Sequence, residues 1–213
     1  MGLGVEAYED VCNVLDVLCP RLVPKPLWGA SIARLVRLRI SEAAVLGLEP
    51  QQLLKLKQFW WSLKREKCDV CDSPARHIDE DWRYYINGSQ GVAVLANLRP
   101  LCEKCHLAKH LGFASAIGRD DEAIQHLAQV NRVDAYTVID LLLEIQIAWA
   151  QLSSLESWRI EIAEGVLPEE LRKPVEKALN KLINMSSTDT ANTTGVDRQR
   201  PKAKTLLDYI KKR

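Results

Sequence analysis

The alternation of apolar and polar residues divides the chain into helical stretches on either side of a shorter β-like centre. Apolar residues recur at helical spacing in 4–19, and residues 27–48 mix helix with turns. Pro50 suits the start of a helix, and residues 51–67 continue from it as a basic amphipathic helix. Beyond the centre, the pattern predicts further helices over residues 120–132, 134–162 and 169–183.

The centre, residues 68–100, is polar and predicts a pair of short strands. Residues 75–86 and 92–98 are rich in β-formers, and Asn87-Gly88 marks a turn between them. The two runs predict a hairpin with a loop longer than two residues. From Cys102 to His110 the pattern becomes helical, so the whole chain is predicted to be mainly α with a small α+β module.

The net charge of +1 hides a strong segregation of charge along the chain. Residues 1–20 carry −4 and residues 119–170 carry −8, whereas residues 21–67 and 171–213 each carry +7. Basic stretches of this kind favour a polyanionic partner, although exposed helix faces can also be charged without one.

The six cysteines favour metal binding or free thiols over a disulfide framework. Cys12 and Cys19 lie in an apolar helix-like segment and are predicted to be buried thiols. The first residues show no secretory signal pattern and no apolar run is long enough to cross a bilayer. We therefore expect an intracellular protein, cytoplasmic or nuclear, without membrane contact.

The strongest chemical signal is a pair of C-x-x-C motifs about thirty residues apart. Each motif presents two thiolates from a tight knuckle, and two knuckles complete a tetrahedral zinc site. The sequence therefore predicts a structural Zn²⁺ ion held by Cys68, Cys71, Cys102 and Cys105. Such a site can replace core burial in a short β-rich segment.

Residues 96–110, ANLRPLCEKCHLAKH, resemble the N-L-x-x-L-C-x-x-C-H-x-x-K segment of HNH endonucleases, whose core is the ββα-metal fold. The resemblance extends back through RHIDEDW to the first C-x-x-C and covers residues 66–112. Leu-Trp-Gly at 27–29 and Lys-His-Leu-Gly at 109–112 are similar to small bacterial-type HNH proteins. The resemblance implies a central zinc-stapled ββα-metal core flanked by helices.

The same resemblance implies a metal-dependent endonuclease that hydrolyses phosphodiester bonds in DNA, in repair, replication or mobile-element processing. Hydrolysis needs a base for water and a divalent ion, Mg²⁺, Mn²⁺ or another, for the developing charge. His106 and His110 stand one helical turn apart and form a two-point metal ligand. The resemblance makes His77, Asn97 and His106 the catalytic residues, with Asn97 orienting the base.

Two assignments are open at the first strand, where Arg76 replaces the usual acid before the histidine. Either His77 is the base and Asp79 joins His106 and His110 as a metal ligand, or Asp79 substitutes for the histidine. We favour the first; the second would weaken the base. His126, in an acidic helix, is predicted to be structural.

The basic region supplies the residues predicted to contact DNA phosphates, with Arg99 close to the scissile phosphate. These residues are Arg34, Arg37, Arg39, Lys55, Lys57, Lys64 and Arg99. Two alternatives are a non-catalytic nucleic-acid-binding or clamp-tethered adaptor, and a helical interaction domain with an incidental zinc knuckle.

The last residues, AKTLLDYIKKR, resemble the box that binds a sliding clamp, with Leu206, Tyr209 and Ile210 as the apolar contacts. Ala203 stands where that box has glutamine, and a terminal amphipathic helix is the alternative. The division of the chain predicted from these features is a helical region at 1–66, the HNH-like module at 67–118, a second helical region at 119–184, a disordered linker at 185–204 and a partner-binding tail at 205–213.

Overall fold

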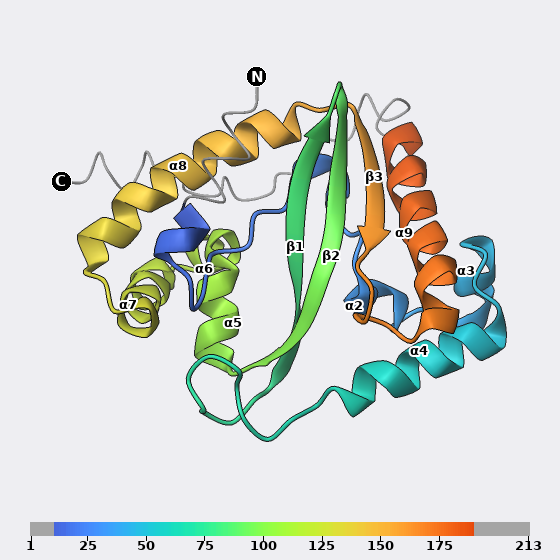
Figure 1. Ribbon diagram of the computed structural model, residues 1–213, viewed down its shortest axis with the longest axis horizontal. Coiled ribbons are helices and arrows are strands. Elements are labelled where there is room, and N and C mark those ends of the chain that lie inside the picture. Colours follow the sequence, from blue (N-terminus) through green and yellow to red (C-terminus); the bar gives the residue numbers. More distant parts are fainter. Residues whose placement is uncertain (1–10, 190–213) are drawn as a thin grey trace.

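The structure, a computed structural model, describes residues 11–189, and in this range helices surround a sheet of three strands (Figure 1). The prediction of a mainly helical protein with a small sheet is confirmed for these residues. The elements are η1 (Lys25–Leu27), α2 (Ile32–Leu35), α3 (Ile40–Val45), α4 (Pro50–Ser62), β1 (His77–Asn87), β2 (Gln90–Leu101), α5 (Glu103–Lys109), α6 (Leu111–Ala116), α7 (Asp120–Asn131), α8 (Ala135–Ser153), β3 (Ser157–Ile162) and α9 (Glu169–Asp189).

Strands β1 and β2 form the predicted antiparallel hairpin in the middle of the molecule (Figure 1). Asn87 pairs with Gln90, so the loop contains two residues and the prediction of a longer loop is wrong. Gly88 has a φ of +61°, which suits glycine at a tight hairpin turn. A bulge shifts the register between Asp81 and Trp82.

The third strand corrects the prediction of one helix over residues 134–162. Helix α8 ends at Ser153, and β3 runs parallel to β2 from Ser157 to Ile162. Its residues alternate, with Trp158, Ile160 and Ile162 buried and the intervening positions more exposed. This period of two was concealed by the long helical pattern directly before it.

Helices gather at both edges of the sheet (Figure 1). On the β1 side α5, α6 and α7 pack together, while α9 lies against β3 and contacts α4. Helix α5 ends at Lys109, and His110, with a φ of −97° and a ψ of 53°, separates it from α6.

Helix α9 continues through Asp189, into the segment predicted as a linker. Residues 190–204 and the tail residues Leu206, Tyr209 and Ile210 lie outside the described residues.

A disulfide joins Cys12 and Cys19, whose Cα atoms are 5.3 Å apart, so the prediction of two buried thiols is wrong. The helical turn at residues 11–14 ends early, and the chain then bends and returns Cys19 to Cys12. Among the described residues, no helix combines the length and apolar character that a membrane crossing requires.

Gly91 of β2 pairs with Trp158 of β3 and lies directly against its side chain. A Cβ atom built on Gly91 would lie 2.6 Å from ring atoms of Trp158.

We expect Gly91→Ala to destabilise the protein by about 1–3 kcal/mol, because the indole must move within a packed core. A urea titration measures the effect. Gly112→Ala, which meets no atom within 4 Å on helix α6, should be neutral or slightly stabilising. Equal midpoints for the two variants would contradict the prediction.

Candidate metal centres and the basic cleft

The four cysteines of the two C-x-x-C motifs converge in space. Cys68 and Cys71 come from the loop before β1, and Cys102 and Cys105 from the start of α5. All four Sγ atoms lie within 4.8 Å of one another, with Cys71 and Cys102 3.5 Å apart and Cys71 and Cys105 3.6 Å apart. A tetrahedral zinc site with Zn–S bonds of about 2.3 Å has S–S edges of about 3.8 Å. The cluster could therefore hold a metal such as zinc.

Each knuckle is shaped by backbone hydrogen bonds to sulfur. The Val70 amide donates to Cys68 Sγ, and the Cys105 amide donates to Cys102 Sγ, both at 3.4 Å. Cys102 is thus the N-cap residue of α5, so the same residue closes the cluster and starts the helix.

The thiols of the cluster differ in acidity. Burial raises the pKa of Cys105, and also that of Cys102. Burial also opposes ionisation of Cys71, but hydrogen bonds with Ser73 and the neighbouring cysteines outweigh it and lower its pKa to about 7. Binding of a divalent cation must therefore release protons from buried thiols, which couples metal affinity to pH.

His126 of α7 contacts this cluster, a position that its sequence environment did not indicate. Its Nε2 atom lies 3.1 Å from Cys105 Sγ. A hydrogen bond between this ring nitrogen and Cys105 Sγ is the kind of contact that would orient the sulfur toward a bound metal.

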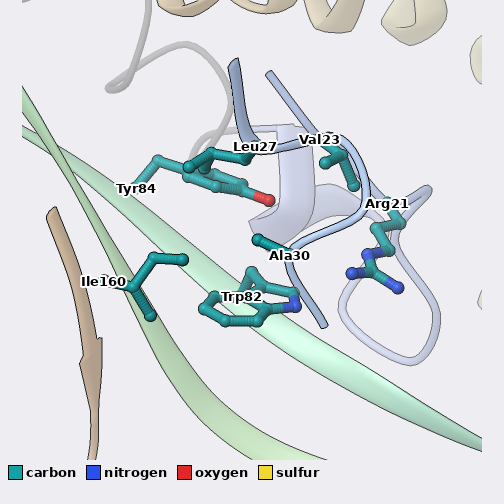
Figure 2. Close-up of a pocket in the computed structure, with 7 residues that line it drawn as sticks. All are labelled: Arg21, Val23, Leu27, Ala30, Trp82, Tyr84 and Ile160. Carbon is teal, nitrogen blue, oxygen red and sulfur yellow. The ribbon is translucent and has the colours of Figure 1, made fainter. Parts of the chain in front are cut away.

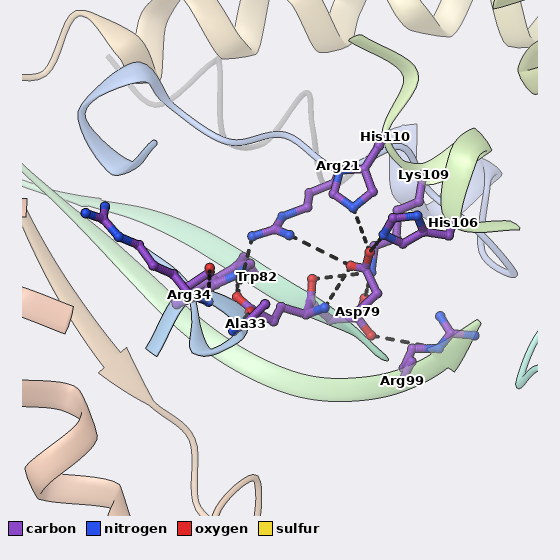
Figure 3. Close-up of polar contacts among 12 residues, drawn as sticks. Arg21, Ala33, Arg34, Asp79, Trp82, Arg99, His106, Lys109 and His110 are labelled. Carbon is purple, nitrogen blue, oxygen red and sulfur yellow. Dashed lines mark hydrogen bonds and ion pairs between the residues drawn. The ribbon is translucent and has the colours of Figure 1, made fainter. Parts of the chain in front are cut away.

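In a second cluster Asp79 of β1 meets two histidines, His106 of α5 and His110 directly after it (Figure 3). Asp79 Oδ2 is 2.7 Å from His110 Nε2 and 3.3 Å from His106 Nε2. Asp79 is 2% exposed, whereas the two imidazoles are half-buried and border the cleft described below. One carboxylate and two imidazoles directed at one point form a donor set that suits a divalent ion.

The predicted pairing of His106 with His110 depends on the helix. The His110 amide donates to the His106 carbonyl at 3.1 Å, so the i, i+4 relation holds although α5 ends at Lys109. His77 joins them, since its ring stacks on that of His106 with centroids 4.1 Å apart and planes 10° from parallel. Residues 77, 79 and 81 alternate along β1, which places their side chains on the same strand face.

Lys109 and Arg21 supply positive charge to this cluster, and sequence reasoning missed both. Lys109 Nζ is 3.1 Å from Asp79 Oδ1 (Figure 3). The same ammonium group pairs with Asp81 and donates to the Glu80 carbonyl, and Lys109 is 5% exposed. Arg21 reaches Asp79 at 3.9 Å and Glu80 at 3.5 Å. The adjacent acids Asp79 and Glu80 were the signal in the sequence that could have indicated such partners, because carboxylates that are buried need cations to pair with.

Glu80 faces away from the histidines and ties the N-terminal segment to the sheet. Its carboxylate accepts hydrogen bonds from the Ala33 amide and the Trp82 indole, each at 3.0 Å. Burial raises the pKa of Glu80, although Arg21 and these donors act against the increase.

The pKa of Asp79 and the pKa of His106 are both lowered, which favours a charged carboxylate and a neutral imidazole. Burial opposes ionisation of Asp79, but the His110 hydrogen bond and the charges of Lys109, His110 and Arg21 prevail and hold its pKa well below the usual range. Burial, followed by the charge of His110, lowers the pKa of His106 to about 4. An ionised carboxylate therefore faces a neutral imidazole, and both can donate electron pairs to a cation.

The histidines open onto a cleft with a volume of about 720 Å³. His77, Asp79, His106 and His110 line it together with helix α4 and the segment before β1. Five cationic side chains also line it, and these are Arg21, Arg37, Lys64, Arg65 and Arg76.

The predicted phosphate contacts divide into two groups. Arg37 and Lys64 line the cleft, as stated above. The others make contacts elsewhere: Arg34 with the Gly29 carbonyl, the Arg39 amide with Glu42, Lys55 with Glu170, Lys57 with the Leu38 carbonyl and Arg99 with Asp81.

Asn97, predicted to orient the base, lies opposite Asp81 in the hairpin, and its Oδ1 accepts from the Leu98 amide. His77 pairs with Leu101 instead. Among the contacts of residues 11–189, none joins Asn97 to His77.

A much smaller cavity lies behind the cleft, between Arg21 and the sheet (Figure 2). Its volume of about 10 Å³ suits a single water molecule and excludes a substrate. Arg21 Nε is buried without a hydrogen-bond partner among the described residues.

Comparisons with known proteins give no match to this chain among family models, curated proteins or solved structures.

The cysteine cluster predicts a metal whose loss costs stability. We expect the purified protein to carry about one zinc ion per chain at this cluster, and Cys105→Ser to lose it, with a melting temperature lower by about 10 °C or more. Elemental analysis and thermal melting measure both effects. Cys12→Ser, outside the cluster, should keep the zinc. Equal zinc content in Cys105→Ser and the wild type would contradict the assignment.

The buried charges predict a strong dependence on Lys109. Lys109→Met leaves Asp79 and Asp81 with less compensation and should cost about 3–5 kcal/mol of unfolding free energy. Lys104→Met, an exposed position on the same helix, should change it by less than about 0.5 kcal/mol. Denaturant titration of the two variants distinguishes them, and similar values would show that the ion cluster does not stabilise the fold.

Proposed function

We propose that the protein is a metal-dependent, HNH-like endonuclease that hydrolyses phosphodiester bonds in DNA. The observation that carries this proposal is the convergence of Asp79, His106 and His110 at one wall of a cleft lined by cations. A nuclease site needs both features, since a divalent ion needs donor atoms and the DNA backbone needs positive charge. In this proposal the cysteine cluster holds structural zinc and has no part in the reaction.

The ligand distances support a divalent ion at the second cluster. Donor atoms bound at about 2.1 Å to an octahedral ion are about 3.0 Å apart. The two distances from Asp79 Oδ2, 2.7 and 3.3 Å, lie on either side of this value. A divalent ion such as Mg²⁺ or Mn²⁺ would supply neutralisation of the charge that develops on the phosphate.

The geometry favours His77 over Asp79 as the general base. The oxygens of Asp79 are engaged with His106, His110 and Lys109, and the residue is almost fully buried. His77 is exposed at the cleft and packs on His106. His77 takes a proton from water as the water oxygen attacks phosphorus, the P–O bond to the leaving oxygen breaks, and that oxygen gains a proton from solvent to leave as an alcohol. Arg76 and Lys64 hold the flanking phosphates.

The competing candidate is a nucleic-acid-binding module without catalysis, which the same basic cleft would serve. The atypical strand motif and the distance of Asn97 from His77 in the hairpin register favour this reading. Binding to a sliding clamp through the C-terminal tail is a separate proposal that rests on the sequence resemblance alone.

A nicking assay on supercoiled plasmid tests the proposal. We expect cleavage with added Mg²⁺ or Mn²⁺, and losses of about 100-fold or more in His77→Ala and His106→Ala, because each removes a base or a ligand. Glu103→Gln, an exposed carboxylate on the same helix, is the control and should cleave normally.

The two variants also separate the competing functions. Cleavage that persists in both histidine variants would contradict the catalytic assignment. DNA binding without cleavage under any divalent metal would favour the non-catalytic module.

A further inference from the structure

Two exposed aromatic side chains line the cleft near Asp79, His106 and His110, and the proposed hydrolysis does not use them. Trp61, at the end of α4, is 57% exposed, and Phe113, in α6, is 60% exposed. Both line the cleft that contains Asp79, His106 and His110. Adjacent residues on a helix point to different faces, and Trp60, the neighbour of Trp61, is buried as part of the core.

The rings are accompanied by cations. Lys64 Nζ lies 4.4 Å from the centroid of the Trp61 ring, and Arg65 and Arg37 line the same cleft. The Lys64 ammonium group lies over one face of the Trp61 ring, so a base would stack on the opposite face with a positive charge close by for the adjoining phosphate. An apolar protein partner would instead have to strip water from these cations, so the charges favour a nucleic acid.

We propose that the cleft binds an unpaired stretch of DNA, with bases stacked on Trp61 and Phe113 and the adjoining phosphates on Lys64, Arg65 and Arg37. This inference deepens the proposed nuclease function and rests on it for the identity of the nucleic acid. In a duplex both faces of every base are covered by its neighbours, so aromatic side chains can stack only on bases that are unpaired or extruded.

The size of the cleft agrees with this substrate. Its volume of about 720 Å³ lies within the range of about 300–1,000 Å³ that is typical of pockets for small ligands. The cleft can therefore hold a short run of nucleotides from one strand. A single-stranded region, a flap or a distorted site in duplex DNA would each bring such a run of nucleotides to Asp79, His106 and His110.

Fluorescence anisotropy with a labelled single-stranded oligonucleotide and a duplex of the same sequence tests the inference. Without added Mg²⁺ or Mn²⁺, binding is measured apart from cleavage. We expect the wild type to prefer the single strand. Trp61→Ala and Phe113→Ala should each weaken single-strand binding by about 5- to 150-fold, the loss of one stacked base. The salt dependence should stay unchanged because no phosphate contact is removed.

Two further variants make the test specific. Trp61→Phe keeps an aromatic face and should retain most of the affinity. Tyr136→Ala removes an aromatic residue that is 65% exposed on α8, outside the residues that line the cleft, and should bind as the wild type does. Thermal melting confirms that each variant is folded. Equal or tighter binding of the duplex by the wild type, or unchanged single-strand binding in both alanine variants, would overturn the inference.

The outcome is independent of the plasmid nicking assay. Selective single-strand binding by a protein that cleaves no DNA would overturn the nuclease and support this inference. Metal-dependent cleavage by a protein that prefers duplex DNA would support the nuclease and overturn this inference.

Discussion

The arrangement of the site depends on burying two adjacent carboxylates, Asp79 and Glu80, on opposite faces of one strand. Neither residue is more than 2% exposed, and buried charges are tolerated only when they are paired and hydrogen-bonded. Arg21 reaches both carboxylates, and Lys109 pairs with Asp79 from the side of α5. Ion pairs, as well as apolar packing, therefore fix the positions of the N-terminal segment, the β1–β2 hairpin and helix α5 relative to one another.

This constraint also explains why Asp79 faces the histidines so closely. Lys109 engages Oδ1, which leaves Oδ2 directed at His106 and His110. Lys109 thus fixes the carboxylate in one orientation before any ion arrives, and a ligand set that is already oriented loses little entropy on binding. The same charges that compensate the burial of Asp79 therefore also orient its Oδ2 atom as a ligand of the proposed divalent ion would have to be oriented.

Local sequence patterns predicted the parts of the site that depend on local spacing. The two C-x-x-C motifs predicted the cysteine cluster because a knuckle is a local structure, and the i, i+4 relation predicted the pairing of His106 with His110. The strand alternation placed Asp79 on the same face as His77. The partners that arrive from distant parts of the chain were not predictable in this way. Arg21 lies 58 residues before Asp79 in the sequence, and His126 lies 21 residues after Cys105. Strand β3 was also missed, since its short alternation follows directly on a long helical pattern.

The two clusters share helix α5, so a metal held by the four cysteines would also help to position the residues of the second cluster. Cys102 and Cys105 fix the beginning of the helix, while His106 and Lys109 extend from its next turn toward β1. Successive residues in an α-helix are rotated by about 100°, so Cys105 and His106 necessarily point in different directions. A helix of seven residues has little stability of its own in water. Its direction is therefore set by tertiary contacts: Leu107 and Ala108 pack in the core and α5 packs on α7, while the cysteine cluster holds the beginning of the helix and the ion pairs of Asp79 hold its end. Loss of a metal from the four cysteines would free the N-terminal end of α5 and make the orientation of both imidazoles less well defined. The geometry of the second cluster would therefore depend on the first, even though the two clusters share no residue.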